Sequence, residues 1–221
     1  AWRKGRRHFT IVAGVDLPLF DARLAAADRE AKRQEIGVAP SDTLIMMTAR
    51  MVSWKGHEDL VGAMRFLPPS MHLALIGWGT IETALKDQAL REGTGTRVHF
   101  LGARSDNVEL LKAADIYVQA HNYAADGSVW KGPNTSQMEA CAAGIPSVST
   151  AVPLIEALIE DGVTGVLARP NDPKDLARAI QWLAEHPEDA RRLANAARAR
   201  IEERYTVRRM VDAYEDLYQS S

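Results

Sequence analysis

Cysteine is almost absent from this chain of 221 residues, which has a single one at Cys141. One cysteine excludes an intramolecular disulfide framework and any zinc site built from several cysteines, and it is compatible with a reducing compartment. Long apolar runs are missing as well, because stretches such as Leu73–Ile76 have the length of a strand, whereas a transmembrane helix needs roughly 18 apolar residues. Neither charge dominates: 27 Lys and Arg residues stand against 29 Asp and Glu residues. The resulting net charge of −2 gives no reason to expect a nucleic acid as a partner.

The first residues of the chain are basic. They read WRKGRRH over positions 2–8, and no apolar segment follows, so we do not interpret them as a secretory signal peptide. They form either a solvated basic segment or a contact with acidic lipid headgroups. The chain begins at Ala1 without a methionine, and we therefore expect that it was cut from a longer protein.

Short β-rich runs alternate with amphipathic stretches along most of the chain. The predicted strands are Thr43–Thr48, Met71–Ile76, Arg97–Leu101, Ile116–Ala120, Ile145–Ser149 and Thr164–Ala168. The helices predicted between them lie around Glu58–Phe66, Ile81–Arg91, Asn107–Ala114, Ser136–Ala143 and Leu154–Ile159. This alternation predicts βαβ units, whose right-handed crossovers build an α/β fold: a Rossmann-like, doubly wound parallel sheet of about six strands.

The two ends of the chain differ from this alternating middle. Residues 1–40 are expected to be a lead-in segment with a short helix near Ala22–Ile36, and residues 41–221 to form the Rossmann-like domain. After Pro170 the pattern is helical, with helices predicted over Pro173–Glu185, Pro187–Arg204 and Val207–Tyr218.

The last predicted helix has an apolar face. Four of its residues recur at helical spacing: Met210, Val211, Tyr214 and Leu217. Such a stripe predicts that the helical C-terminal tail packs onto the core of the domain.

Capping residues agree with several of these helix boundaries. Asp106 and Glu109 have the spacing of a capping box, and Asp172 precedes a proline that suits the first turn of a helix. Gly144 and Gly162 stand where a helix is expected to end in a left-handed residue.

Ligands of open parallel sheets bind beyond the carboxyl ends of the strands, so the loops there are the candidate sites. The first such loop carries Arg50 and Lys55, either a pair that holds a diphosphate or two solvated basic side chains. The second carries Gly77 and Gly79, which form either a tight turn or a backbone that lies close to a phosphate. Glu82 occupies the place of the third glycine in a dinucleotide fingerprint, which argues against a nicotinamide or flavin dehydrogenase.

The third loop and the fourth hold the remaining candidates. The third contains Gly102 and Arg104, whose guanidinium can pair with a ligand or face solvent. The fourth is the longest, and three residues of N-cap type stand before and at the start of its helix: Asn134, Thr135 and Ser136. Backbone N–H groups at a helix start attract anions. Glu139 follows one turn later, where a carboxylate can accept hydrogen bonds from sugar hydroxyls or simply stabilise the helix dipole.

These short motifs follow one another in a distinctive order. They are GVD at 14–16, Arg50 with KGH at 55–57, Gly77 and Gly79, Gly102, Asn134 followed by EACAAGIP at 139–146, and DGVTG at 161–165. The order resembles the C-terminal half of GT-B-fold glycosyltransferases, above all the retaining family 4 group with its "glycosyl transferases group 1" domain. The resemblance extends from about Gly14 to the C-terminal helix, and within it Cys141 is a small core residue rather than a nucleophile.

The resemblance implies a function. Such proteins transfer a sugar from a nucleoside diphosphate sugar, for example a UDP sugar, to an acceptor in the cleft between two Rossmann-like domains. The chain would be the donor-binding half, and the N-terminal acceptor domain, roughly 150–200 residues by ordinary domain size, would lie outside it. Alone, the chain is expected to bind donor and to catalyse little or nothing. The implied acceptors are saccharides, lipid-linked molecules or small molecules, in bacterial polysaccharide biosynthesis. The implied location is the cytoplasm, with peripheral contact at the cytoplasmic membrane face.

The resemblance also assigns roles to residues. Arg50 and Lys55 would be the catalytic residues, because fixed cations stabilise the charge that develops on the departing diphosphate. They would replace a metal ion, so that neither a metal nor a cofactor besides the donor is expected. Glu139 would bind the ribose hydroxyls. The other donor-binding residues would be Asn134, Thr135, Ser136, Gly77, Gly79, Lys131, Gly102 and Arg104, the last two bordering the base.

Two departures from the family pattern bear on this function. Lys131 stands eight positions before Glu139, where the family usually has a second glutamate, and Ala49 stands where a glycine commonly precedes the arginine. Lys131 would pair with an acidic sugar or a phosphate, or would be solvated. It is the feature that supports a second hypothesis, a non-catalytic nucleotide- or sugar-binding module of the same fold. A third hypothesis is a sugar-nucleotide epimerase on this scaffold.

Overall fold

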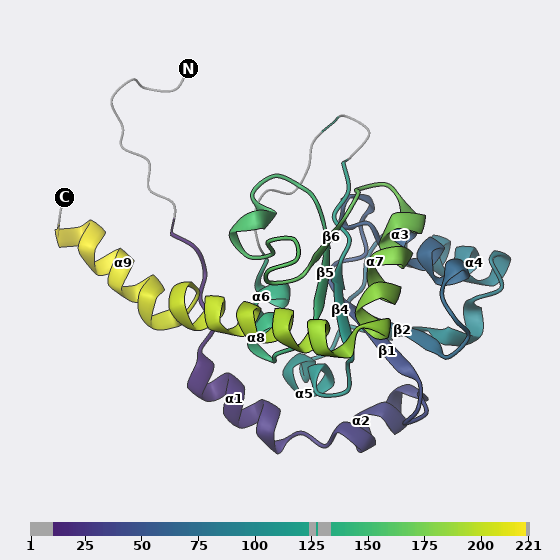
Figure 1. Ribbon diagram of the computed structural model, residues 1–221, viewed down its shortest axis with the longest axis horizontal. Helices are drawn as coiled ribbons and strands as arrows, with labels where there is room; N and C mark the ends of the chain where they lie inside the picture. The colour runs from purple at the N-terminus through teal and green to yellow at the C-terminus, as the bar shows by residue number, and fades with distance from the viewer. Residues whose placement is uncertain (1–10, 124–126, 128–133, 220–221) are drawn as a thin grey trace.

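Six parallel strands form the centre of the molecule (Figure 1). The computed structural model describes residues 11–123, 127 and 134–219. The strands are β1 (Thr43–Thr48), β2 (Met71–Ile76), β3 (Val98–Gly102), β4 (Ile116–Gln119), β5 (Ser147–Thr150) and β6 (Val166–Ala168). Each predicted strand is present, with ends shifted by two residues or fewer. The prediction of a doubly wound α/β sheet of about six strands is confirmed.

The strand order is β3-β2-β1-β4-β5-β6. Strands β2 and β3 are therefore added on one side of β1, and β4, β5 and β6 are added on the other side. β1 is the pivot, because it pairs with β2 along its whole length and with β4 through Ile45 and Met46. The carboxyl ends of β1 and β4 consequently border the point where the order reverses, which is where doubly wound sheets bind ligands.

Alternate side chains of the strands enter two separate hydrophobic layers. In β1, Ile45 and Met47 face one layer, and Leu44 and Met46 face the other. All four side chains are fully buried. Both faces of the sheet are therefore covered by helices, as expected for a parallel sheet whose strands are apolar runs.

Each layer is closed by its own set of helices. The first lies under α3 (His57–Ala63), α4 (Glu82–Arg91) and α7 (Pro173–Glu185). The second lies under α5 (Asn107–Leu111) and α6 (Thr135–Ala142). The long helix α8 (Pro187–Arg204) begins beside α7 and then packs on α6, so it joins both layers (Figure 1). Cys141 is fully buried in the second layer, as expected for a core residue.

The N-terminal region contains two helices where one short helix was predicted. They are α1 (Leu17–Ala26) and α2 (Arg29–Ile36). The chain is extended at Ala27, and the carboxylate of Asp28 caps the second helix by accepting the N–H groups of Glu30 and Ala31. Phe20 and Ile36 reach the second hydrophobic layer, so both helices belong to the packed body.

Three other local predictions need correction. Asp106 does not cap α5 with its side chain, because Arg104 and Lys32 occupy its carboxylate. The helix predicted over Leu154–Ile159 is a short 3₁₀ turn, Ile155–Ala157, since the left-handed Leu154 precedes it. Gly162 has the expected positive φ of 69° but lies in a tight turn closed onto Gly165 rather than at a helix end.

Other caps are present as predicted. Asp172 accepts the N–H of Asp175 at the start of α7, and Gly144 is left-handed with φ 69° after α6.

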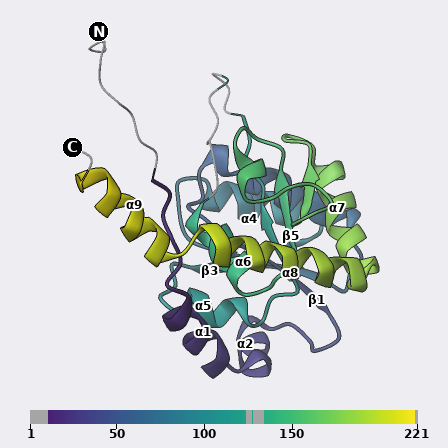
Figure 2. The same cartoon turned by 60° about the vertical axis from the view of Figure 1, so that its left-hand side comes forward.

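The C-terminal helix α9 (Val207–Gln219) extends away from the body (Figures 1 and 2). None of its residues is buried, so the prediction that Met210, Val211, Tyr214 and Leu217 pack into the core is wrong. Val211 and Tyr214 are 40% and 43% exposed. Helical periodicity identifies an apolar face but does not identify what covers it.

Within the residues that the structure describes, no helix combines the length and the apolar character needed to cross a bilayer. The basic residues 2–8, for which a lipid contact was considered, lie outside the described residues.

A buried arginine attaches α2 to the amino-terminal edge of the sheet. Arg33 is 2% exposed and donates to the carboxylate of Asp115 at 3.0 Å and to the carbonyls of Ala113 and Ala39 at 2.9 Å. Its second Nη also contacts the carbonyl of Asp42. Asp115 in turn accepts the N–H of Leu44 at 2.8 Å, at the start of β1. The arginine thereby satisfies several polar groups in the interior.

We expect Arg33→Ala to lower the free energy of unfolding by about 3 kcal/mol, because it leaves buried acceptors without their donor. Arg208→Ala is the matched control, since the Arg208 side chain is 86% exposed and pairs with the exposed Asp212 one turn away. It should change stability by about 0.5 kcal/mol or less. Urea unfolding of both variants measures the difference, and equal stabilities would contradict the role given to Arg33.

Candidate functional site

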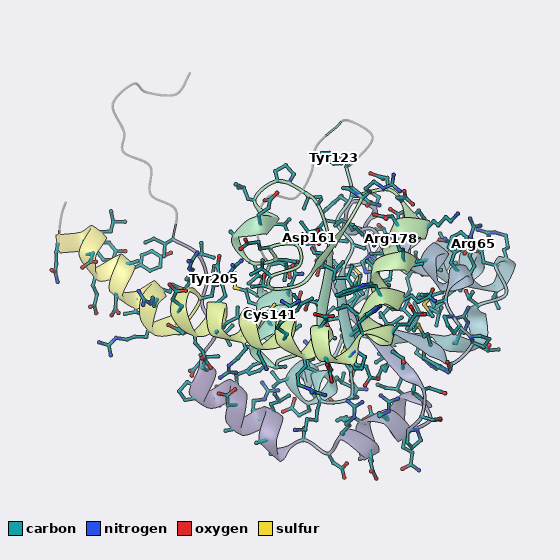
Figure 3. The ribbon with its side chains drawn as sticks, viewed as in Figure 1. Arg65, Tyr123, Cys141, Asp161, Arg178 and Tyr205 are labelled. Atoms are coloured by element: carbon teal, nitrogen blue, oxygen red, sulfur yellow. The ribbon has the colours of Figure 1, made fainter. Side chains whose placement is uncertain are left out.

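A cavity of about 670 Å³ opens at the carboxyl ends of β1 and β2, next to the point where the strand order reverses. The loops after these strands, the start of α5 and the start of α6 surround it. Tyr123, labelled in Figure 3, lies at the same edge of the sheet, in the segment that follows β4. The cavity thus occupies the place predicted from the doubly wound topology.

Two cations meet in this cavity. Arg50 follows β1 directly and is exposed, and Lys55 ends a single 3₁₀ turn, Ser53–Lys55, and is half-buried. Burial, and to a lesser degree the charge of Arg50, lowers the pKa of Lys55 to about 8. The structure therefore brings together the two residues to which catalytic roles were assigned.

The start of α6 forms another wall. The side chain of Asn134 caps the helix by accepting the N–H of Gln137 at 2.8 Å. The hydroxyl of Ser136 contacts this amide oxygen and the carbonyl of Thr48 in β1, at 2.8 and 2.9 Å. The cap therefore locks the start of α6 to the end of β1. Thr135 and Ser136 line the cavity, and in the first turn of a helix their N–H groups have no intrahelical acceptor.

Glu139 lies in a smaller hollow that adjoins the main cavity. This hollow of about 180 Å³ shares Thr135 and Met138 with the larger one, and it also contains Arg23. Burial raises the pKa of Glu139, and the charge of Arg23 opposes that rise. A ligand with one end at Arg50 and Lys55 would therefore have to extend along the start of α6 for its other end to reach Glu139.

The predicted glycines serve the packing of the loops. Gly77 lines the cavity with φ 128°, and a Cβ there would stand 2.1 Å from the carbonyl oxygen of Ala49. A Cβ at Gly79 would stand 2.1 Å from the carbonyl oxygen of Met51. Gly102 is left-handed, and its carbonyl accepts the N–H of Gly77. Gly79 and Gly102 do not line the cavity themselves.

Arg104 lines the cavity but already has carboxylate partners. Its guanidinium bonds to Asp106 at 2.7 Å and to Glu35 at 2.5 Å, and the hydrogen bonds hold the pKa of Asp106 well below its usual value. These two carboxylates largely compensate the positive charge of Arg104. Lys131 lies outside the described residues.

Some residues at the site were not singled out from the sequence. Trp78, 67% exposed, and Asn107 line the main cavity, and His121, fully buried, contacts Lys55. Each follows a predicted strand end by a few residues, which is the signal that could have indicated them. Among the described residues, no group of three or more His, Cys, Asp or Glu side chains is arranged to hold a metal ion.

Comparisons with known proteins agree with this geometry. A family model described as glycosyl transferases group 1 matches residues 28–200. A D-inositol 3-phosphate glycosyltransferase from Xylanimonas cellulosilytica is 30% identical over 202 residues, which cover 87% of this chain and 46% of that protein. HepE from Anabaena, solved in complex with UDP and glucose, has a TM-score of 0.83 at 26% identity and covers 96% of this chain and 56% of its own.

An isolated domain has the same fold. The C-terminal domain of a group 1 glycosyl transferase, LpcC from Francisella tularensis, gives a TM-score of 0.72 at 20% identity, over 88% of this chain and 100% of that domain. The chain spans about half the length of the curated relatives it matches, between 46% and 50% for three of them. The family match covers most of the chain and includes every described site residue from Arg50 to Glu139, so the chain belongs to the glycosyl transferases group 1.

Proposed function

We propose that this chain is the donor-binding domain of a glycosyltransferase, which binds a nucleoside diphosphate sugar whose sugar the parent protein transfers to an acceptor. The observation that carries the proposal is the meeting of Arg50 and Lys55 in one cavity beside the start of α6. Family membership supports the reaction class. The similarity to HepE in complex with UDP supports a uridine diphosphate donor.

The geometry suits a departing diphosphate. Negative charge accumulates on the nucleoside diphosphate as its bond to the sugar breaks, and cations already in place stabilise that charge without reorganisation. Arg50 and Lys55 supply the cations, and the first N–H groups of α6 supply further donors. We include in the proposal that these groups act without a divalent metal ion, and that the sugar is transferred with retention of configuration.

The adjoining hollow suits the nucleoside. Glu139 is half-buried there, and its carboxylate offers acceptors for the two hydroxyls of a ribose. With the diphosphate at Arg50 and Lys55, the nucleoside would lie along the first turn of α6, past Thr135 and Met138, which line both hollows.

The proposed partner within the parent protein is an N-terminal acceptor domain. Curated relatives are about twice as long as this chain. The segment before α1 joins the start of α9 through hydrogen bonds of Val15 with Tyr205 at 2.7 Å and with Val207 at 3.0 Å. Residues 11–15 and α9 therefore leave the body side by side, where a preceding domain would cover the exposed Val211 and Tyr214. The acceptor itself would be a saccharide, a lipid-linked molecule or a small molecule bound by that domain.

We expect Arg50→Ala and Lys55→Ala each to weaken UDP binding roughly 10- to 150-fold, the value of one charge-assisted hydrogen bond. Binding of uridine should change little, because the two cations act on the diphosphate. Calorimetry with UDP, UMP and uridine measures both effects. Arg65→Ala and Lys86→Ala are matched controls outside the cavity. Absence of UDP binding by the unmodified chain, or unchanged affinity in both site variants, would contradict the proposal.

Glu139→Gln should weaken UDP and uridine to a similar extent, by about tenfold, because the charge of the ribose acceptor is lost in both complexes. Glu188→Gln, which alters a first-turn carboxylate of α8, is the control. If Glu139 only stabilised its helix, its replacement would lower the unfolding temperature and leave both affinities unchanged.

The pH dependence of binding follows from Lys55. Because its pKa in the free protein lies at about 8, the ammonium is present below that pH and is lost above it. UDP affinity should therefore fall as the pH rises through 8, by at most about tenfold per pH unit. Above pH 8 binding should be accompanied by uptake of close to one proton. Calorimetry in buffers of different ionisation enthalpy measures the uptake, and a pH-independent affinity from about 7 to 9.5 would contradict the assignment.

A further inference from the structure

The side chain of Lys55 contacts the imidazole of His121. Its Nζ lies 3.0 Å from Nε2 of His121, and the side-chain nitrogen of Gln119 lies 3.4 Å from the same ring nitrogen. An ammonium group can only donate hydrogen bonds, so the imidazole nitrogen that faces it must accept. His121 therefore carries its proton on Nδ1 and presents a bare Nε2 to the lysine.

The surroundings keep His121 in this neutral form. The side chain is fully buried, and burial, followed by the charges of Lys55 and His57, lowers the pKa of His121 to about 3. His57 is itself buried beside Lys55, and burial lowers its pKa to about 4. The charge of Arg50, on the same loop as Lys55, also lowers the pKa of the lysine. Within the described part of the chain, the Lys55 ammonium thus contacts the neutral imidazole of His121, and the lysine also lines the cavity.

Backbone contacts fix the distance between the two residues. Gly56 is left-handed and packs so closely on β4 that a Cβ there would stand 1.5 Å from the carbonyl oxygen of Ala120. The N–H of Asn122 donates to the carbonyl of Trp54 at 3.1 Å. Thr150, at the end of β5, donates its hydroxyl to the carbonyl of His121 at 2.6 Å. Two contacts therefore hold the Lys55 turn against the segment after β4, and the third attaches His121 to β5.

We propose that His121 is a positioning residue for Lys55: by accepting the hydrogen bond of the ammonium it directs that group into the cavity where the donor diphosphate binds. This inference rests on the proposed function, because it takes the diphosphate as the ligand of Lys55. His121 does not contact the donor in this arrangement. The inference predicts that its effect on binding and catalysis passes through the lysine.

Two substitutions separate the acceptor from the volume of the ring. His121→Phe keeps a planar ring of similar size but offers no acceptor, and His121→Gln keeps an acceptor oxygen at a comparable reach. Loss of the acceptor removes an interaction that favours the charged lysine, so the Lys55 pKa should fall further in His121→Phe. UDP affinity at pH 7.5 should then fall about tenfold in His121→Phe and about twofold in His121→Gln. If His121→Phe does not fold, His121→Leu makes the same comparison, because leucine also offers no acceptor.

A double-mutant cycle tests whether the effect passes through the lysine. His121→Phe should weaken UDP binding in the unmodified chain and have no further effect in the Lys55→Ala background. His99→Phe is the control, because His99 is a half-buried histidine of β3 that contacts His72 and does not line the cavity. Equal losses from His121→Phe in both backgrounds would overturn the proposal.

A titration without nucleotide keeps this test separate from the proposed function. The rate at which Lys55 reacts with fluorodinitrobenzene, followed by mass spectrometry of its peptide, reports the lysine pKa in the free chain. We expect a midpoint at about 8 in the unmodified chain, nearly the same in His121→Gln, and at lower pH in His121→Phe. A midpoint that His121→Phe leaves unchanged would refute the inference even if UDP binds. Failure of the unmodified chain to bind UDP would refute the proposed donor site, and the titration would still report on His121.

Discussion

The close packing of two loops at the switch point is the constraint on which the candidate site depends. Gly56 brings the turn after β1 against the carbonyl of Ala120 at the end of β4, at a separation that no side chain at position 56 would permit. This contact removes Lys55 from bulk water while Arg50 stays exposed at the cavity. Burial consequently lowers the pKa of Lys55. The difference follows from the backbone, because both residues belong to one short loop.

The partners of Arg33, Arg104 and Arg198 differ in charge from the histidine that Lys55 contacts. Arg33, Arg104 and Arg198 each bond to a carboxylate that lies far away in the sequence or on a neighbouring turn. In each pair the carboxylate offsets the charge of the arginine. Lys55 contacts His121, which offers an acceptor without a negative charge. A hydrogen bond to a neutral acceptor orients the ammonium without neutralising its charge, whereas a carboxylate at the same place would neutralise it.

Sequence patterns correctly predicted the features that depend on neighbouring residues in the chain, such as the positions of the strands. The apolar runs at Thr43–Thr48 and Met71–Ile76 match β1 and β2 to the residue, because a strand buried on both faces is apolar throughout. Predictions failed where a distant group decides the outcome. The Asp106 carboxylate was expected to cap α5, yet Lys32 of α2 reaches it at 2.6 Å. The sequence correctly predicted the apolar stripe of α9, but periodicity carries no information on whether such a stripe is buried, and in this structure Val211 and Tyr214 are exposed.

In the candidate site, too, the sequence predicted the local features but not the contact between distant residues. The sequence predicted that Arg50 and Lys55 lie together because one loop carries both. It also predicted where α6 begins, because N-cap residues mark that position. The contact between Lys55 and His121 joins residues 66 positions apart across two strands, and no spacing in the sequence encodes it. It depends on the strand order, which makes β4 the neighbour of β1, and on Gly56, which closes the remaining distance. The motif Lys-Gly-His at 55–57 therefore has a physical reason beyond its lysine: the glycine lets the loop approach β4, and the approach supplies the lysine with a neutral, buried acceptor.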